Sequence, residues 1–118
     1  MYGLAKDLDL SFLKGRTLVQ LCFGLHDMTF NFDGDLSIHV EVSIEIAMPT
    51  GEKLLLRNYA KAAEKISILL DDVIDSSSHT ADGILNIDFI GGASLTIRDD
   101  NRRYESYIIR HAGREIVV

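Results

Sequence analysis

The longest regular pattern in the chain is a strict alternation of apolar and polar residues from Met28 to Ile46. Its even positions are apolar or Gly, and the odd positions between them are polar or charged. A period of two residues is typical of strands that bury one face only. A fully extended stretch of this length would span about 60 Å, which is longer than a small domain, so it must turn back on itself.

Asp33-Gly34-Asp35 is the predicted turn of this stretch. A three-residue loop keeps Phe32 opposite Leu36 on the apolar face, because the side chains of a strand change face at every residue. The same parity predicts a second hairpin turn at residues 48–51, where Pro and Gly favour a turn. The register pairs that follow from the predicted turns include Met28 with Val40, Ile46 with Leu54, Ile44 with Leu56, Ile109 with Ile116 and Arg110 with Glu115.

Most of the remaining chain is also predicted to be β structure. Apolar residues recur at helical spacing from Asn58 to Asp71, so this segment is expected to form the only substantial helix and to pack on the sheet. A short helical turn is expected near Ser11. Further strands are predicted at residues 18–23, 84–89, 95–97, 104–109 and 115–118.

Similar segments recur in the same order in the two parts of the chain, at an offset that grows only from 56 to 63 residues. We therefore expect one α+β domain, residues 1–118, that is mainly antiparallel β and contains two tandem related halves, 9–57 and 65–118. Each half would be a helical segment followed by about five strands. Together they would form a sheet pair or a barrel-like roll with one main helix packed on it. The matched segments begin at Ser11 and Ser67, Met28 and Ile84, Leu36 and Leu95, Ser43 and Ser106, and Leu54 and Ile116.

Two motifs in the second half, Ile87-Asp-Phe-Ile-Gly-Gly92 and Tyr104-Glu-Ser-Tyr107, resemble those of a family of small bacterial proteins of unknown function. In that family an apolar-x-Phe-x-x-Gly hairpin is followed by a strand with Tyr-Glu-x-aromatic. The resemblance covers most of the chain from Asp9 onward and implies no catalytic residues. The chain is also similar in size and acidity to some bacterial immunity proteins that bind toxins.

Composition and charge narrow the classes of partner. The chain has 118 residues and a net charge of −6, so attraction to nucleic acid or to an anionic membrane is not expected, whereas a basic protein is a suitable partner. The start of the chain lacks a signal-peptide pattern, and no apolar stretch approaches the ~20 residues of a membrane span. The single Cys22 fits a reducing compartment, so a cytoplasmic location is expected.

No motif in the sequence predicts catalysis, a cofactor or a metal site. Cys22 and His26 have the spacing of a ligand pair, but structural zinc sites usually need four ligands and no second pair completes the set. The acidic residues around Gly34 resemble the start of a calcium loop but lack its bidentate Glu. We therefore expect no catalytic residues, no cofactor and no metal.

The candidate binding residues lie on strands in both halves. In the first half, His39 and Glu41 share the polar face of the alternating stretch with Ser43 and Glu45. In the second half, Glu105 lies between two tyrosines. If Glu105 faced the core, its carboxylate would need a partner or a raised pKa. If Ser106 faces the core instead, Glu105 and Tyr107 share the opposite face. The complete set is His39, Glu41, Arg103, Tyr104, Glu105 and Tyr107.

Two classes of function are consistent with these residues. The first is a non-catalytic interaction module, immunity-like in type, whose acidic strand face binds a basic protein or a second copy of the chain as a homodimer. The second is a small-molecule binder or enzyme with a pocket between the two repeats, lined by Tyr104, Glu105 and a His.

Overall fold

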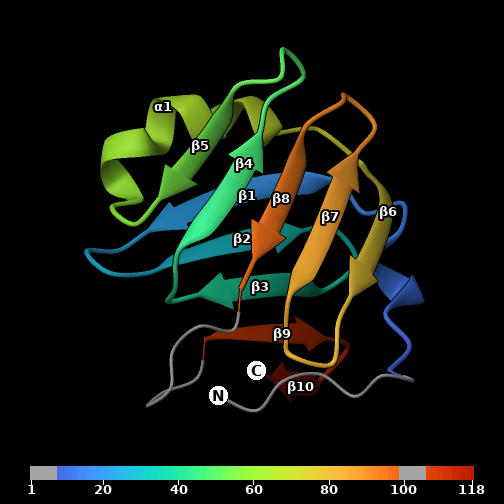
Figure 1. The fold of residues 1–118 in the computed structure, drawn as a ribbon. Helices are drawn as coiled ribbons and strands as arrows, with labels where there is room; N and C mark the ends of the chain where they lie inside the picture. Colours follow the sequence, from blue (N-terminus) through green and yellow to red (C-terminus); the bar gives the residue numbers. More distant parts are fainter. Residues whose placement is uncertain (1–7, 99–105) are drawn as a thin grey trace.

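The computed structural model describes residues 8–98 and 106–118, which form two five-stranded antiparallel sheets packed face to face. The strands of one sheet cross those of the other (Figure 1). The first sheet has the order β1-β2-β3-β9-β10 and contains β1 (Leu18–Phe23), β2 (Met28–Phe32), β3 (Leu36–Val40), β9 (Tyr107–His111) and β10 (Arg114–Val117). The second has the order β5-β4-β8-β7-β6 and contains β4 (Ile44–Ala47), β5 (Lys53–Leu56), β6 (Ile74–His79), β7 (Leu85–Phe89) and β8 (Ser94–Ile97). The described residues thus form a sheet pair and not a closed barrel.

The hairpin of β2 and β3 confirms the predicted turn and its parity. Phe32 pairs with Leu36 and Met28 with Val40, so the loop between the strands has three residues. Gly34 has φ +69°, in the left-handed region where glycine is favoured. Even-numbered side chains of both strands are buried and odd-numbered ones are partly exposed. The other predicted register pairs are also present: Ile46 with Leu54, Ile44 with Leu56, Ile109 with Ile116 and Arg110 with Glu115.

The alternating stretch does not remain in one sheet. β3 ends at Val40 in the first sheet, and the chain turns a corner and enters the second sheet as β4 at Ile44. The alternation continues through the corner because both sheets bury their inner faces in the same core, and Val42 at the corner is also buried. The polar positions before and after the corner consequently belong to different sheets.

The core between the sheets is apolar and contains two buried tyrosines. Tyr59 donates a hydrogen bond to the carbonyl oxygen of Val42, and Tyr107 donates one of 2.8 Å to that of Gly83. A buried phenol needs such a partner, because an unpaired polar group in an apolar interior is costly. The largest fully buried side chains also include Phe30, Leu13, Leu18, Met28, Ile38, Ile44, Ile46, Ile66, Leu69 and Ile74.

The helix predicted for Asn58 to Asp71 is far shorter in the structure. It consists of α1 (Ala63–Ile66) between two 3₁₀ turns, η2 (Ala60–Ala62) and η3 (Ser67–Leu69). The helical segment ends because Leu70 is extended and Asp71 has φ +70°, which lets the Asp71 N–H donate to the carbonyl of Leu18. A contact with β1 therefore replaces the last helical turn. Among the described residues, no helix has the length and apolar character needed to cross a membrane.

Each sheet combines strands from both parts of the chain. The first sheet contains β1, β2 and β3 with β9 and β10, and the second contains β6, β7 and β8 with β4 and β5. β3 pairs with β9 and β4 with β8, so these two pairings hold the N-terminal and C-terminal strands together within the sheets. The described N-terminal segment also includes the 3₁₀ helix η1 (Ser11–Leu13).

Candidate functional site

The candidate site lies on the outer face of the first sheet, at one end of the β2–β3 hairpin. Thr29 on β2 and His39 on β3 are directly paired, and both side chains point away from the core. Asp27 precedes β2 and Glu41 follows β3, so each lies two residues from one member of this pair. Because side chains at i and i+2 share a face, the antiparallel register brings all four residues together.

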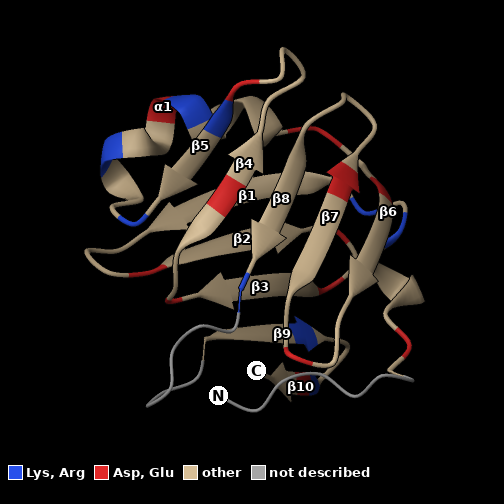
Figure 2. Ribbon diagram, in the orientation of Figure 1, with Lys and Arg blue, Asp and Glu red and all other residues tan. Residues whose placement is uncertain are grey.

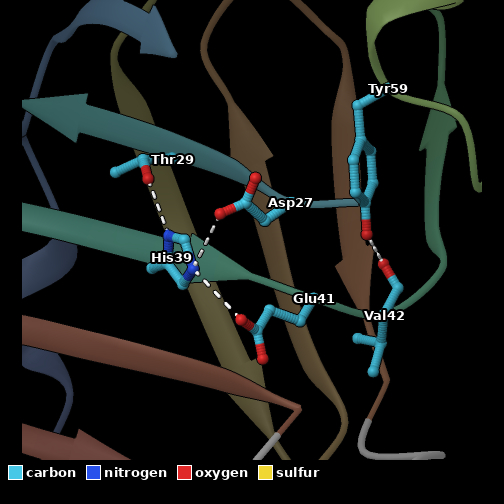
Figure 3. Close-up of polar contacts among 6 residues, drawn as sticks. All are labelled: Asp27, Thr29, His39, Glu41, Val42 and Tyr59. Carbon is cyan, nitrogen blue, oxygen red and sulfur yellow. Dashed lines mark hydrogen bonds and ion pairs between the residues drawn. The ribbon is translucent and has the colours of Figure 1, made fainter. Parts of the chain in front are cut away.

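The His39 imidazole is at the centre of this group (Figure 3). Its Nδ1 atom is 2.8 Å from Thr29 Oγ1, and its Nε2 atom is 3.4 Å from Asp27 Oδ2 and 3.6 Å from Glu41 Oε1. The exposed fractions of the His39, Asp27 and Glu41 side chains are 22%, 41% and 48%. The imidazole is thus partly enclosed, while both carboxylates are accessible from solvent.

The ion pairs of Asp27 and Glu41 differ from those of Glu45, Glu52 and Glu115. Within the described part of the chain, the only basic group within 4.0 Å of either carboxylate is His39. In contrast, Glu45 pairs with Arg98 at 3.4 Å, Glu52 with Lys65 at 3.7 Å and Glu115 with Arg110 at 2.9 Å. Acidic positions are spread over both sheets and several loops (Figure 2), so acidity alone does not distinguish this site. What distinguishes it is that two carboxylates face one imidazole and that, within the described residues, neither has a Lys or Arg partner.

The group also has the composition of a metal site. One ligand atom each from Asp27, His39 and Glu41 can be chosen so that all three lie within 4.8 Å of one another. The sequence-based expectation of no metal considered the Cys22 and His26 spacing and the acidic residues around Gly34, but not this group. The new group could have been found from sequence, because the predicted pairing of Met28 with Val40 already places residues 27 and 41 side by side.

The predicted binding residues fall into three groups. The structure brings His39 and Glu41 together in the site just described. Tyr107 lies on the inner face of the first sheet, 1% exposed, with its hydroxyl bonded to Gly83, so it is part of the core. Its neighbour Ser106 is buried as well. Arg103, Tyr104 and Glu105 lie outside the described residues.

A groove of about 450 Å³ lies at the other end of the β2–β3 hairpin, beside the turn between β9 and β10. The Arg110–Glu115 ion pair lines it, and so does His111, whose ring stacks on Phe12 with centroids 4.4 Å apart. This groove lies at one end of the strands of the first sheet and not between the two sheets. Sequence reasoning did not find it, because its lining comes from two hairpins, β2–β3 and β9–β10, that are distant in sequence and lie side by side only through the β3–β9 pairing.

Comparison with known proteins gives one match. A family model, described as a family of unknown function, DUF6188, matches residues 10–118. The chain belongs to DUF6188. No curated protein and no solved structure matches it. The match confirms the resemblance to a family of unknown function. Because DUF6188 has no assigned activity, the match assigns no function to this chain.

Proposed function

We propose that this protein is a non-catalytic interaction module, immunity-like in type, in which Asp27 and Glu41 bind Lys or Arg side chains of a basic protein. One observation carries the proposal: Asp27 and Glu41 lie together beside His39 on the outer face of the first sheet, and among the described residues neither has a Lys or Arg within ion-pair distance. A basic partner would supply the missing counter-charge. We place this module in the bacterial cytoplasm, as the sequence suggested.

The exposure of the two carboxylates indicates what such contacts would contribute. Asp27 and Glu41 are about half exposed, so each ion pair would contribute roughly 0–1 kcal/mol to affinity. Their main effect would be on association, because an uncompensated acidic group on a chain of net charge −6 accelerates the encounter with a basic surface. Affinity would then require apolar contact nearby.

Leu25 is suited to that apolar contact. It lies in the turn between β1 and β2, two residues before Asp27, and is 78% exposed. A large apolar side chain at the rim of an acidic group can fill a pocket on a partner while the carboxylates pair around it. This arrangement also favours a different protein over a second copy of the chain, because a symmetric contact would bring two acidic groups face to face.

The test is a pull-down from the native host with matched charge variants. D27N/E41Q removes the two carboxylates that lie beside His39, and E52Q/E64Q removes the same charge from two exposed residues elsewhere. We expect wild type and E52Q/E64Q to retain a stoichiometric basic protein that D27N/E41Q loses. Retention of the same partner by D27N/E41Q would contradict the proposed surface.

Light scattering of the isolated protein tests the homodimer, which a strictly monomeric species at high concentration would exclude.

We further propose that the chain contains two related halves, each a helical segment followed by five strands. The first and sixth strands support this, because β1 and β6 have the same burial pattern and each has a register shift after its first residue. Thr17 and Val73, which form a bridge, are 56 residues apart, the offset at which the sequence similarity begins. A chain carrying residues 9–64 twice should fold cooperatively if the halves are equivalent, and an aggregated or unfolded product would argue against this.

The groove near Arg110 supports a second candidate function, small-molecule binding. It is lined by polar side chains from three neighbouring strands, namely Asn31, Ser37 and Arg110, at a place where N-terminal and C-terminal strands meet. Arg114 and His111 add donors suited to an anionic ligand. A ligand screen separates the two functions. If R110Q loses binding of a small molecule and D27N/E41Q keeps it, the ligand binds in the groove and not at the acidic site.

A further inference from the structure

A second property of the Asp27, His39 and Glu41 group goes beyond protein binding and does not depend on it. We propose that these three side chains bind one divalent first-row transition-metal ion, with His39 Nε2, Asp27 Oδ2 and Glu41 Oε1 as ligands. An imidazole nitrogen and two carboxylate oxygens are a donor set that Zn²⁺ and its neighbours accept. With three protein ligands, further coordination positions would be open to water or to a partner's side chain.

The spacing of the ligand atoms fits an ion better than it fits direct hydrogen bonds. Charge-assisted N–H···O bonds are about 2.7–2.9 Å long, whereas His39 Nε2 is 3.4 and 3.6 Å from the two carboxylate oxygens. In a tetrahedral zinc site with bonds of about 2.0–2.2 Å, neighbouring ligand atoms are about 3.4 Å apart. The two observed separations therefore match two edges of such a tetrahedron, and one ligand atom from each of the three residues can be chosen so that all lie within 4.8 Å of one another.

Thr29 orients the imidazole for this role. Its Oγ1 atom is 2.8 Å from His39 Nδ1, and when Nδ1–H donates to this oxygen, the lone pair of Nε2 faces Asp27 and Glu41. A metal ion between the three groups could then accept this lone pair and one oxygen of each carboxylate. Metal-binding histidines commonly donate their other ring N–H to an oxygen in this way, which fixes the tautomer and the ring.

The strands hold the ligands in place before an ion arrives. Thr29 and His39 are paired within two strands whose alternate side chains are buried in the core. The site is therefore largely preformed, and binding needs only rotation of two exposed carboxylates. Loss of one ligand should weaken binding strongly, and loss of the orienting hydroxyl less strongly.

Zinc titration of the isolated, full-length protein after chelator treatment tests the site. Isothermal titration calorimetry should give one equivalent of Zn²⁺ for wild type. H39N removes a ligand and should weaken zinc binding at least about 10-fold. T29V removes only the group that orients this ligand, and it should weaken binding about 10-fold, the lower end of the effect seen for such groups. H26N and C22S are the matched controls, because both residues are exposed potential ligands outside the group, and both variants should bind as wild type does.

Two outcomes of the titration would overturn the proposal. In the first, the wild-type protein shows no saturable binding of one equivalent of zinc. In the second, H39N still binds zinc and C22S or H26N does not. If H39N fails to fold, the ¹⁵N resonances of the wild-type imidazoles decide, because zinc must shift His39 Nε2, and a shift confined to other histidines contradicts the site. No partner is present in these measurements, so their failure leaves the partner proposal standing. Conversely, a pull-down in the presence of a chelator tests whether the two carboxylates bind the protein partner when no metal is bound.

Discussion

Thr17 and Val73 face each other in an isolated antiparallel bridge that joins the start of the first sheet to the start of the second. Four backbone hydrogen bonds flank the pair: Gly15 N–H to Ile74 O, Ile74 N–H to Arg16 O, Leu18 N–H to Asp72 O and Asp71 N–H to Leu18 O, all 2.8–2.9 Å long. The sheets are therefore linked through the backbone as well as through the core.

The bridge predicts that the two sheets unfold together. In hydrogen exchange, the amides of Leu18 and Ile74 should exchange only through global unfolding, because breaking their bonds requires separating the sheets. The amide of the exposed Leu25 provides a comparison within the same chain and should exchange much faster. Exchange of Leu18 or Ile74 at the rate of Leu25 would mean that the sheets separate locally.

Tyr107→Phe should reduce stability by about 1–2 kcal/mol, because it leaves the buried carbonyl of Gly83 without its 2.8 Å hydrogen bond. Urea unfolding measures this change. Since Tyr107 is part of the core, the variant should capture the same partner as wild type in the pull-down. A folded Y107F protein that loses the partner would instead restore the binding role that the sequence suggested for this residue.

Ile38→Ala should cost about 2–5 kcal/mol, since Ile38 is fully buried between the sheets and its truncation leaves a cavity. Leu55→Ala is the control: Leu55 also lies in a strand but is 65% exposed, so its truncation should change the free energy of unfolding by less than about 0.5 kcal/mol. Thermal or urea unfolding distinguishes the two. Equal losses would indicate that Leu55 is covered in solution, for example by a second copy of the chain.

Salt should slow the association of the protein with its basic partner. Exposed charges are screened over about 8 Å at physiological ionic strength, so the association rate should fall as salt rises. Glu41→Gln should reduce both the rate at low salt and its dependence on salt, and E64Q serves as the matched control. If Glu41→Gln changed the dissociation rate and left the association rate unchanged, Glu41 would lie in a desolvated contact and not at the solvent-exposed rim of the interface.

Asp9 provides a pH-dependent probe of the N-terminal turn. The Ser11 backbone N–H, 2.9 Å from Asp9 Oδ1, is the main cause that lowers the pKa of this carboxyl below 3.8, and the Ser11 hydroxyl adds to it. The stabilising effect is therefore present above pH 3.8 and is lost as pH falls through the lowered pKa. NMR titration should give a midpoint below 3.8 that rises only partly in S11A. A midpoint at or above 3.8 in wild type would mean that the turn is open in solution.

Local pattern was sufficient to predict the hairpins and their register. The three-residue turn at Gly34 follows from parity alone, because a one-residue slip would expose Phe30 and Ile38. The corner at residues 41–43 could not be predicted in this way, since the alternation continues unbroken from one sheet into the other. The helix was overestimated because apolar spacing does not separate α-helix from 3₁₀ helix: the segment from Ala60 to Leu69 is helical, but only Ala63–Ile66 is α-helix, and the Asp71 hydrogen bond to Leu18 follows its end.

The candidate site was only partly predictable. His39 and Glu41 were identified from their polar positions on an amphipathic strand, and Asp27 was available from the same register. The site is distinguished by two carboxylates that face one imidazole, and the lack of a Lys or Arg beside them depends on where basic residues such as Arg98 and Arg110 lie in the fold. Residues distant in sequence determine those positions, so no local pattern reveals which carboxylates remain without a counterion.

The exchange of strands between the sheets makes the two parts of the chain mutually dependent. A cut in the exposed segment around Asn58 would yield one fragment with β1–β5 and another with β6–β10. Each fragment would carry three strands of one sheet and two of the other, so neither could complete a sheet alone. The two fragments should therefore reassemble by complementation when mixed, and a split form of this protein could report on the proximity of two molecules fused to its pieces.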